Sequence, residues 1–348
     1  MSCIHGDGFT RFAFALAACI MLTHAGPMAA AEATKPSLPT AGPKTMGGQY
    51  FWADELVYFG WRIQRNTFTG HCRLLDEDHR RYTFGSFETC LAKLDEIKRQ
   101  KKLPPMKGKV VLVLGGLGDA RAIPENMARF LHDRGGYMAQ CVAYPSLFDD
   151  IGEHAKSLDS VVRHLDGIDE IDFVGHSLGN LVIRRYLGDH TNAAKGTKPD
   201  KRIKRIVMLG PPNQGAELAE KLGDYPAFIA AFGESGQQLG KRWNELKPTL
   251  ATPACEFGII AGGRGDGRGY NPLLSGDNDG IVTVASTRLG GARDFLLVNE
   301  LHFVLLHSSS VQDRTLEFLR HGYFVSEKKR QPIKRKRPRE PILTDGLG

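Results

Sequence analysis

The chain lacks several features that would fix its class at once. After residue 31, no apolar run reaches the roughly 18 residues that a membrane-spanning helix needs, which excludes a protein with several such helices. No Cys and His residues stand at the spacing of a zinc site, and no internal repeat is evident. Charged residues make up 24% and hydrophobic residues 41% of the 348 residues, so a mainly disordered, collagen-like or coiled-coil chain is also excluded.

The net charge of +7 lies mostly at one end of the chain. Residues 327–348 contain eight basic and three acidic residues, a charge of +5, and the remainder carries only +2. Because this segment is almost free of apolar residues, we expect a disordered basic tail over residues 325–348. Its lysines and arginines are suited to contact with an anionic surface, or they are simply solvated. The nearly neutral body makes nucleic acid an unexpected substrate.

The first 31 residues have the pattern of an export signal. Arg11 precedes the apolar stretch 12–22, and Ala29-Ala30-Ala31 fits a small-residue cleavage site. We therefore expect an exported protein, periplasmic or extracellular, whose mature chain starts near Glu32. Two alternatives stay open: a lipid attached to Cys19, which ends a lipobox-like tetrapeptide, and a leader retained as an anchor.

From residue 109 onward, short apolar runs alternate with helical patterns. The runs that we predict as strands are 109–116, 137–145, 171–177, 203–212, 255–263 and 294–302. Strands that alternate with helices predict an α/β fold, with a mostly parallel central sheet and helices on both faces.

Residues 32–105 are predicted to form a linker and an N-terminal ββα extension. The extension consists of a hairpin, with strands in 61–76 and 80–85, and a helix from residue 87, and we expect its strands to join the edge of the central sheet. Cys72 and Cys90 lie in this extension, and whether they form a disulfide is left open.

The strongest motif is Gly175-His176-Ser177-Leu178-Gly179. It follows an apolar strand and precedes a helix, the context in which G-x-S-x-G forms a nucleophile elbow. The tight turn projects the Ser177 hydroxyl, and a side chain at Gly175 or Gly179 would clash across the turn. The helix that starts behind Ser177 offers a free N–H for developing negative charge. His176 is predicted to be a packing residue.

On these residues the sequence resembles the α/β-hydrolase fold and, within it, bacterial lipases and esterases. The resemblance covers residues 106–324 and implies the chain order Ser, acid, His. The implied acid is Asp279, in Asn278-Asp279-Gly280, with Asp277 as the competitor. The implied base is His302, after the last predicted strand, with His307 as the competitor.

The resemblance also implies where the oxyanion hole lies. The loop Leu114-Gly115-Gly116-Leu117-Gly118-Asp119 follows the first predicted parallel strand, with Leu114 where such lipases have His. By alignment, the backbone N–H of Gly116 is one donor and that of Leu178 is the other, with Leu117 as the alternative to Gly116. Residues 216–254 form a helical insertion, either a lid over Ser177 or a cover for the sheet.

Together these features predict an exported serine hydrolase that cleaves a small-molecule or lipid carboxylic ester through an acyl-enzyme. No cofactor and no metal are expected. An acyltransferase, a thioesterase or an amidase would use the same triad, and a non-catalytic binding module with this fold is a further alternative. The oligomeric state and the natural ester are left open.

Overall fold

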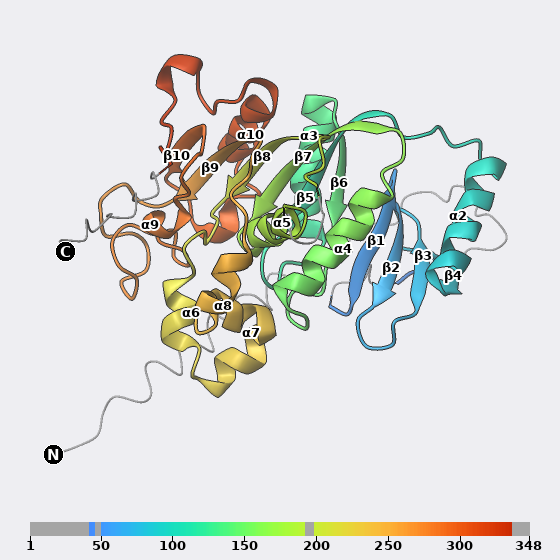
Figure 1. Cartoon of the computed structure of the whole chain (residues 1–348), viewed down its shortest axis with the longest axis horizontal. Helices are drawn as coiled ribbons and strands as arrows, with labels where there is room; N and C mark the ends of the chain where they lie inside the picture. Colours follow the sequence, from blue (N-terminus) through green and yellow to red (C-terminus); the bar gives the residue numbers. More distant parts are fainter. Residues whose placement is uncertain (1–41, 46–49, 192–197, 336–348) are drawn as a thin grey trace, which may run out of the picture.

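The computed structural model describes residues 42–45, 50–191 and 198–335 (Figure 1). The predicted export signal, its cleavage site and the last 13 residues of the basic tail lie outside these ranges. Within the described ranges, none of the helices has the length and apolar character to cross a membrane.

A six-stranded sheet forms the centre of the molecule. Its strands are β5 (Gly108–Leu114), β6 (Met138–Val142), β7 (Ile168–His176), β8 (Ile203–Leu209), β9 (Glu256–Gly262) and β10 (Asp294–Val298). They pair in the order β10-β9-β8-β7-β5-β6, and every pairing is parallel. The predicted parallel sheet is thus confirmed, and its continuous apolar runs reflect burial on both faces.

Helices cover both faces of this sheet (Figure 1). On one face, Val111 and Val113 of β5 pack with α3 (Ala122–Gly135) and α10 (Ser309–His321). On the other, Val110 and Leu112 pack with α4 (Ile151–Arg163) and α5 (Leu178–Asp189). Alternate residues of one strand therefore contribute to two separate cores.

The N-terminal extension is a sheet of its own, which corrects the predicted hairpin at the edge of the central sheet. It consists of β1 (Trp52–Tyr58), β2 (Trp61–Asn66), β3 (Cys72–Leu75), β4 (Arg81–Gly85) and the helix α2 (Phe87–Gln100). The four strands are antiparallel in the order β1-β2-β3-β4. The predicted strand 61–76 is broken because the Asn66 side chain accepts hydrogen bonds from the N–H groups of Phe68 and Thr69, an Asx turn.

The cysteines of the extension are buried and not bridged. Among the described residues, Cys72, Cys90, Cys141 and Cys255 are all free thiols. Burial raises the pKa of Cys90 to about 12 and also raises that of Cys72. Both side chains belong to the apolar core beneath α2.

The insertion after β8 folds into α6 (Glu217–Leu222), α7 (Pro226–Leu239) and α8 (Trp243–Leu246), which lie together at one end of the central sheet (Figure 1). Inside α7, Gly233 has φ +57, and a Cβ atom there would lie 2.0 Å from the carbonyl oxygen of Leu147. The middle of α7 therefore rests directly on the loop after β6.

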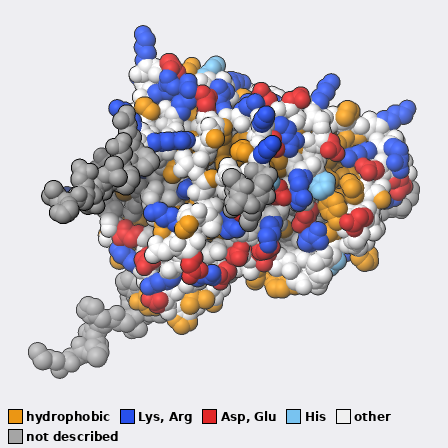
Figure 2. Space-filling model, viewed as in Figure 1, with side chains coloured by type: hydrophobic (Ala, Val, Ile, Leu, Met, Phe, Trp, Pro, Cys, Tyr) orange, Lys and Arg blue, Asp and Glu red, His pale blue; other side chains and the backbone are white. Residues whose placement is uncertain are grey.

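Residues 325–335 correct the expectation of a tail that is disordered from residue 325. The N–H of Ile333 donates to the carbonyl of Ala292 over 2.9 Å, and its carbonyl accepts from the N–H of Gly291 over 2.7 Å. The Ile333 side chain packs against the main core. Gln331 and Arg335 also hydrogen-bond to Asp294 and to the Pro253 carbonyl, so several contacts attach this part of the chain. On the body, basic and acidic side chains are mixed over the face that Figure 2 shows.

Candidate active site

Ser177 lies in a strained turn between β7 and α5. Its φ of +49° and ψ of −119° lie outside the regions that side-chain-bearing residues usually adopt. The turn is held because the N–H of Ser177 donates to the carbonyl of Leu209, at the end of β8, over 2.9 Å. The side chain of Asn180 donates to the Ser177 and Leu209 carbonyls. This is the geometry of a nucleophile elbow.

The two glycines of the motif are required by close approaches. A Cβ atom at Gly175 would lie 2.4 Å from Oδ1 of Asn180. At Gly179 it would lie 2.6 Å from the carbonyl oxygen of Gly115. The turn therefore packs directly against the loop after β5.

Asp279 and His302 form a buried hydrogen-bonded pair. Nδ1 of His302 lies 2.7 Å from Oδ2 of Asp279. The other carboxylate oxygen accepts from the N–H groups of Ile281 and Val282, and the His302 N–H donates to the Asp279 carbonyl. The two residues come from the loops after β9 and β10, and these bonds fix both the carboxylate and the ring.

The environment of His302 favours its protonated form. Burial alone would lower the pKa of the imidazole, but the Asp279 carboxylate outweighs burial by its charge and its hydrogen bond, and the charge of Asp119 adds to it. The pKa of His302 is therefore raised above its usual value of 6.5.

The end of β8 lies between His302 and Ser177 and contacts both. A Cβ atom at Gly210, which follows β8, would lie 3.1 Å from Nδ1 of His302. The residue before it, Leu209, accepts the N–H of Ser177. In addition, the ring of His302 lies 4.8 Å, between centroids, from that of His176. Ser177, Asp279 and His302 thus all follow the carboxyl ends of strands of one parallel sheet, β7, β9 and β10.

Asp277 and His307, the competing candidates for the acid and the base, make other contacts. Asp277 accepts from the N–H groups of Arg264 and Gly265 and organises the loop after β9. His307 is exposed and contacts the side chain of Asn126 on α3.

The predicted oxyanion loop contains an acid that sequence reasoning missed. Gly116 lies against Ser177, because a Cβ atom on it would be 3.0 Å from Cβ of Ser177. Its N–H, however, donates to Oδ2 of Asp119. Burial would raise the pKa of Asp119, but the contacts with His176 and the Gly116 N–H lower it overall. Leu178 is the first residue of α5, where a helix leaves N–H groups without internal partners.

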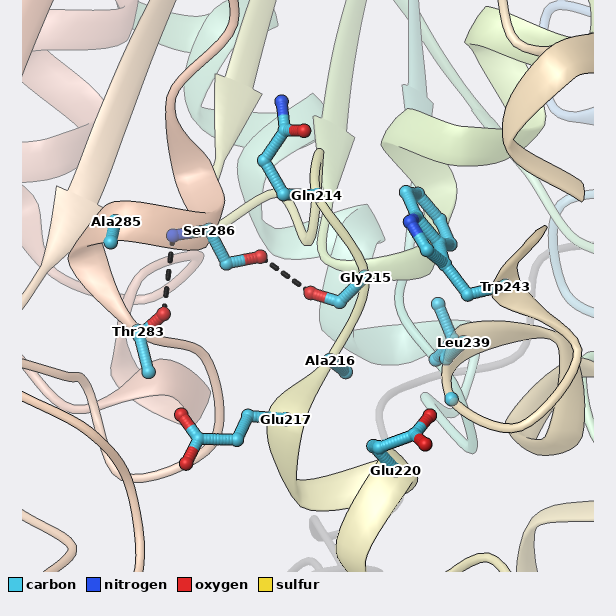
Figure 3. Close-up of a pocket in the computed structure, with 11 residues that line it drawn as sticks. Gln214, Gly215, Ala216, Glu217, Glu220, Leu239, Trp243, Thr283, Ala285 and Ser286 are labelled. Atoms are coloured by element: carbon cyan, nitrogen blue, oxygen red, sulfur yellow. Dashed lines mark hydrogen bonds between the residues drawn. The ribbon is translucent and has the colours of Figure 1, made fainter.

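A cavity of about 470 Å³ lies between the insertion and residues 283–286 (Figure 3). The indole of Trp243 and the side chain of Leu239 line one side, and the carboxylates of Glu217 and Glu220 lie below (Figure 3). The hydroxyl of Ser286 donates to the Gly215 carbonyl in its wall.

Within the part of the chain that the structure describes, no group of His, Cys, Asp and Glu is arranged to hold a metal ion.

Comparison with known proteins identifies no family and gives only distant structural likenesses. No protein-family model and no curated protein matches the chain. Among solved structures, the mature lipase BlEst2 of Bacillus licheniformis is 18% identical, with a TM-score of 0.42 over 63% of this chain and 94% of that one. The Staphylococcus hyicus lipase is 12% identical, with a TM-score of 0.42 over 58% and 89%. A metagenomic carboxyl esterase is 21% identical, with a TM-score of 0.41 over 57% and 65%. The α/β-hydrolase fold rests on the strand order and the elbow of this chain itself.

Proposed function

We propose that this protein is a serine hydrolase that cleaves carboxylic esters. The observation that carries the proposal is the Asp279–His302 pair, held beside a strained serine at the end of a parallel strand. A strained serine with a base that is itself oriented by a third group is the arrangement that activates a hydroxyl for acyl transfer.

The roles follow from the hydrogen bonds. An ionised carboxylate only accepts, so Nδ1 of His302 carries the proton toward Asp279 and Nε2 is left as the base. Ser177 Oγ attacks the ester carbonyl while Nε2 takes its proton, and the protonated ring then gives that proton to the leaving alcohol. Water hydrolyses the acyl-enzyme by the same steps.

The oxyanion is stabilised by the N–H of Leu178 and by one N–H of the loop after β5. Because Gly116 donates to Asp119, this second donor is Leu117, or Gly116 once Asp119 has turned away. Either donor lies in the segment that packs against the elbow.

The surface beside His302 favours an ester with an apolar group. Leu301, Phe303 and Val304 flank the base and are 43%, 46% and 37% exposed. Exposed apolar side chains at the edge of a site provide binding area for an acyl chain or a lipid. We therefore include lipid esters in the proposed substrate class. Export of the chain, and contact of the basic residues after 335 with an anionic surface, are proposed from the sequence alone.

The test is turnover of p-nitrophenyl butyrate and labelling by a fluorophosphonate. Ser177→Ala is expected to abolish labelling and to lower kcat on the order of 10⁶-fold, as in other serine hydrolases. Ser86→Ala, at the start of α2, is the control and should behave as the wild type. Equal turnover by wild type and Ser177→Ala would refute the proposal. Product analysis with added alcohol separates hydrolysis from acyl transfer.

A further inference from the structure

The N-terminal sheet shares a buried polar contact with the catalytic domain. Its first strand, β1, is the strand of this sheet that faces the central sheet (Figure 1). In β1, the side chain of Asp54 is completely buried. A buried carboxylate is costly unless it is paired and hydrogen-bonded, so its partners identify what it holds.

Both carboxylate oxygens of Asp54 have partners. Oδ2 accepts from Nη1 of Arg121 over 2.6 Å and from the N–H of Ala143 over 2.8 Å. Oδ1 accepts from the side chain of Gln64, on β2, over 2.8 Å. The N–H of Asp54 also donates to the Ala143 carbonyl over 2.8 Å. Asp54 thus joins the N-terminal sheet to Arg121, just before α3, and to Ala143, just after β6.

Arg121 ends the loop that lies against the nucleophile. Residues 115–121 connect β5 to α3, and their other end packs on the elbow through Gly115 and Gly116. The guanidinium also donates to Glu125 over 2.6 Å and to the Cys141 carbonyl over 3.2 Å. Burial would lower the pKa of Arg121, but the charges of Asp54 and Glu125 raise it overall, so the group stays charged.

We infer that the N-terminal sheet is a positioning element of the active site, in which Asp54 holds Arg121 and thereby sets the loop 115–121 against Ser177. The inference rests on the proposed function, since this loop supplies one oxyanion donor. The donor must lie within a few tenths of an ångström of its productive position. Asp54 and Arg121 touch no substrate; they act through the backbone between Arg121 and Gly116.

The experiment compares Asp54→Asn with a matched control on the same strand. Glu55→Gln removes the neighbouring carboxylate, whose partner Arg65 lies within the N-terminal sheet. In Asp54→Asn, kcat for p-nitrophenyl butyrate should fall about 10- to 100-fold with KM within about threefold, because losing a whole oxyanion donor costs about 10²–10³ in kcat and displacing one costs less. Glu55→Gln should keep the wild-type kcat.

A second readout reports the oxyanion donor itself. A trifluoromethyl ketone forms a bond from its carbonyl carbon to Ser177 Oγ, with the serine proton passing to His302 and the negative charge on the ketone oxygen. Its inhibition constant should rise in Asp54→Asn in proportion to the loss of kcat/KM. A role limited to stability would lower the melting temperature and leave this constant and kcat unchanged in the folded protein.

Amide hydrogen exchange of peptides covering residues 115–121 makes the test independent of ester turnover. Exchange there should rise in Asp54→Asn and stay unchanged in Glu55→Gln. If Asp54→Asn does not fold, Arg121→Lys takes its place. Lysine keeps the charge but cannot hydrogen-bond to Asp54 and to the Cys141 carbonyl at the same time. Wild-type kcat and unchanged exchange in a folded variant would overturn the inference. An inactive wild type would instead refute the proposed function, and exchange alone would then decide whether Asp54 positions the loop.

Discussion

Asp119 and His176 form a buried pair behind Ser177, with Nδ1 of the ring 3.1 Å from Oδ2 of the carboxylate. Nε2 of the same ring lies 3.1 Å from the backbone carbonyl oxygen of His302. The ring of His176 therefore bridges the Asp119 carboxylate and the backbone of His302. His176, which the sequence predicts to be a packing residue, thus forms a second Asp–His pair with Asp119, and its ring contacts the backbone of His302.

The charge of Asp119 is expected to contribute to the position of the acid limb of the pH profile, after the larger effect of Asp279. Asp119→Asn removes a negative charge that raises the pKa of His302. Because only neutral His302 acts as a base, activity is lost as the pH falls through this pKa. The acid limb of kcat/KM should therefore move to lower pH in the variant. Asp133→Asn, an exposed position on α3, is the control, and an unmoved limb in Asp119→Asn would contradict this role.

Substitution of Asp279 should lower kcat far more than substitution of Asp277, although both acids lie in the loop after β9. Asp279→Asn is expected to lower kcat about 10⁴-fold, because the amide no longer fixes the tautomer of His302. Asp277→Asn removes a carboxylate of the same loop that binds only backbone N–H groups, and kcat should stay within about tenfold of the wild type. Steady-state kinetics of both variants decide the assignment. The reverse ranking would make Asp277 the acid.

His154 is expected to make the fold sensitive to acid. It is buried on α4, its Nε2 lies 3.1 Å from the hydroxyl of Ser235 on α7, and Nδ1 has no hydrogen-bond partner among the described residues. Burial lowers its pKa to about 3, below the usual value of 6.5. The unfolded chain therefore binds a proton that the folded chain does not, and stability present above pH 6.5 is lost as the pH falls toward about 3.

The measurement is the melting temperature between pH 7 and pH 4. The decline should be shallower in His154→Gln than in the wild type, whereas His132→Gln, at an exposed position on α3, should keep the wild-type slope. Equal slopes in all three proteins would show that His154 is not the group responsible.

The buried thiols of the extension should resist modification. Burial raises the pKa of Cys72 and Cys90, so little thiolate is present near neutral pH. An aromatic disulfide reagent should label both at once in urea and only slowly in the native protein. Mass spectrometry of the unreduced protein checks the pairing, and a peptide cross-linked through these two residues would contradict free thiols.

The catalytic part of the fold could be predicted because its signals are local. Strands of a parallel sheet are buried on both faces and stand out as apolar runs. The elbow is one contiguous motif, and the chain order of the fold leaves few places for the acid and the base.

The N-terminal extension and the Asp119–His176 pair could not be predicted in this way, because they depend on contacts between residues that are far apart in the sequence. The extension has a polar interior: Arg62, Gln64 and Arg73 are all buried in it, so its strands lack a clear apolar pattern. Asp119 looks like an ordinary acid in a glycine-rich turn, and its partner His176 lies 57 residues away. A single sequence does not show such pairings.

The contact of Gly233 with Leu147 limits how the insertion 216–254 can move. Nearby, the N–H of Ile151 donates to the side chain of Gln238, so α7 is joined to the start of α4 as well. The loop after β6 and the start of α4 therefore hold α7 at two points. The insertion is thus anchored to the body of the molecule through its middle helix, and α7 can move only if both contacts break.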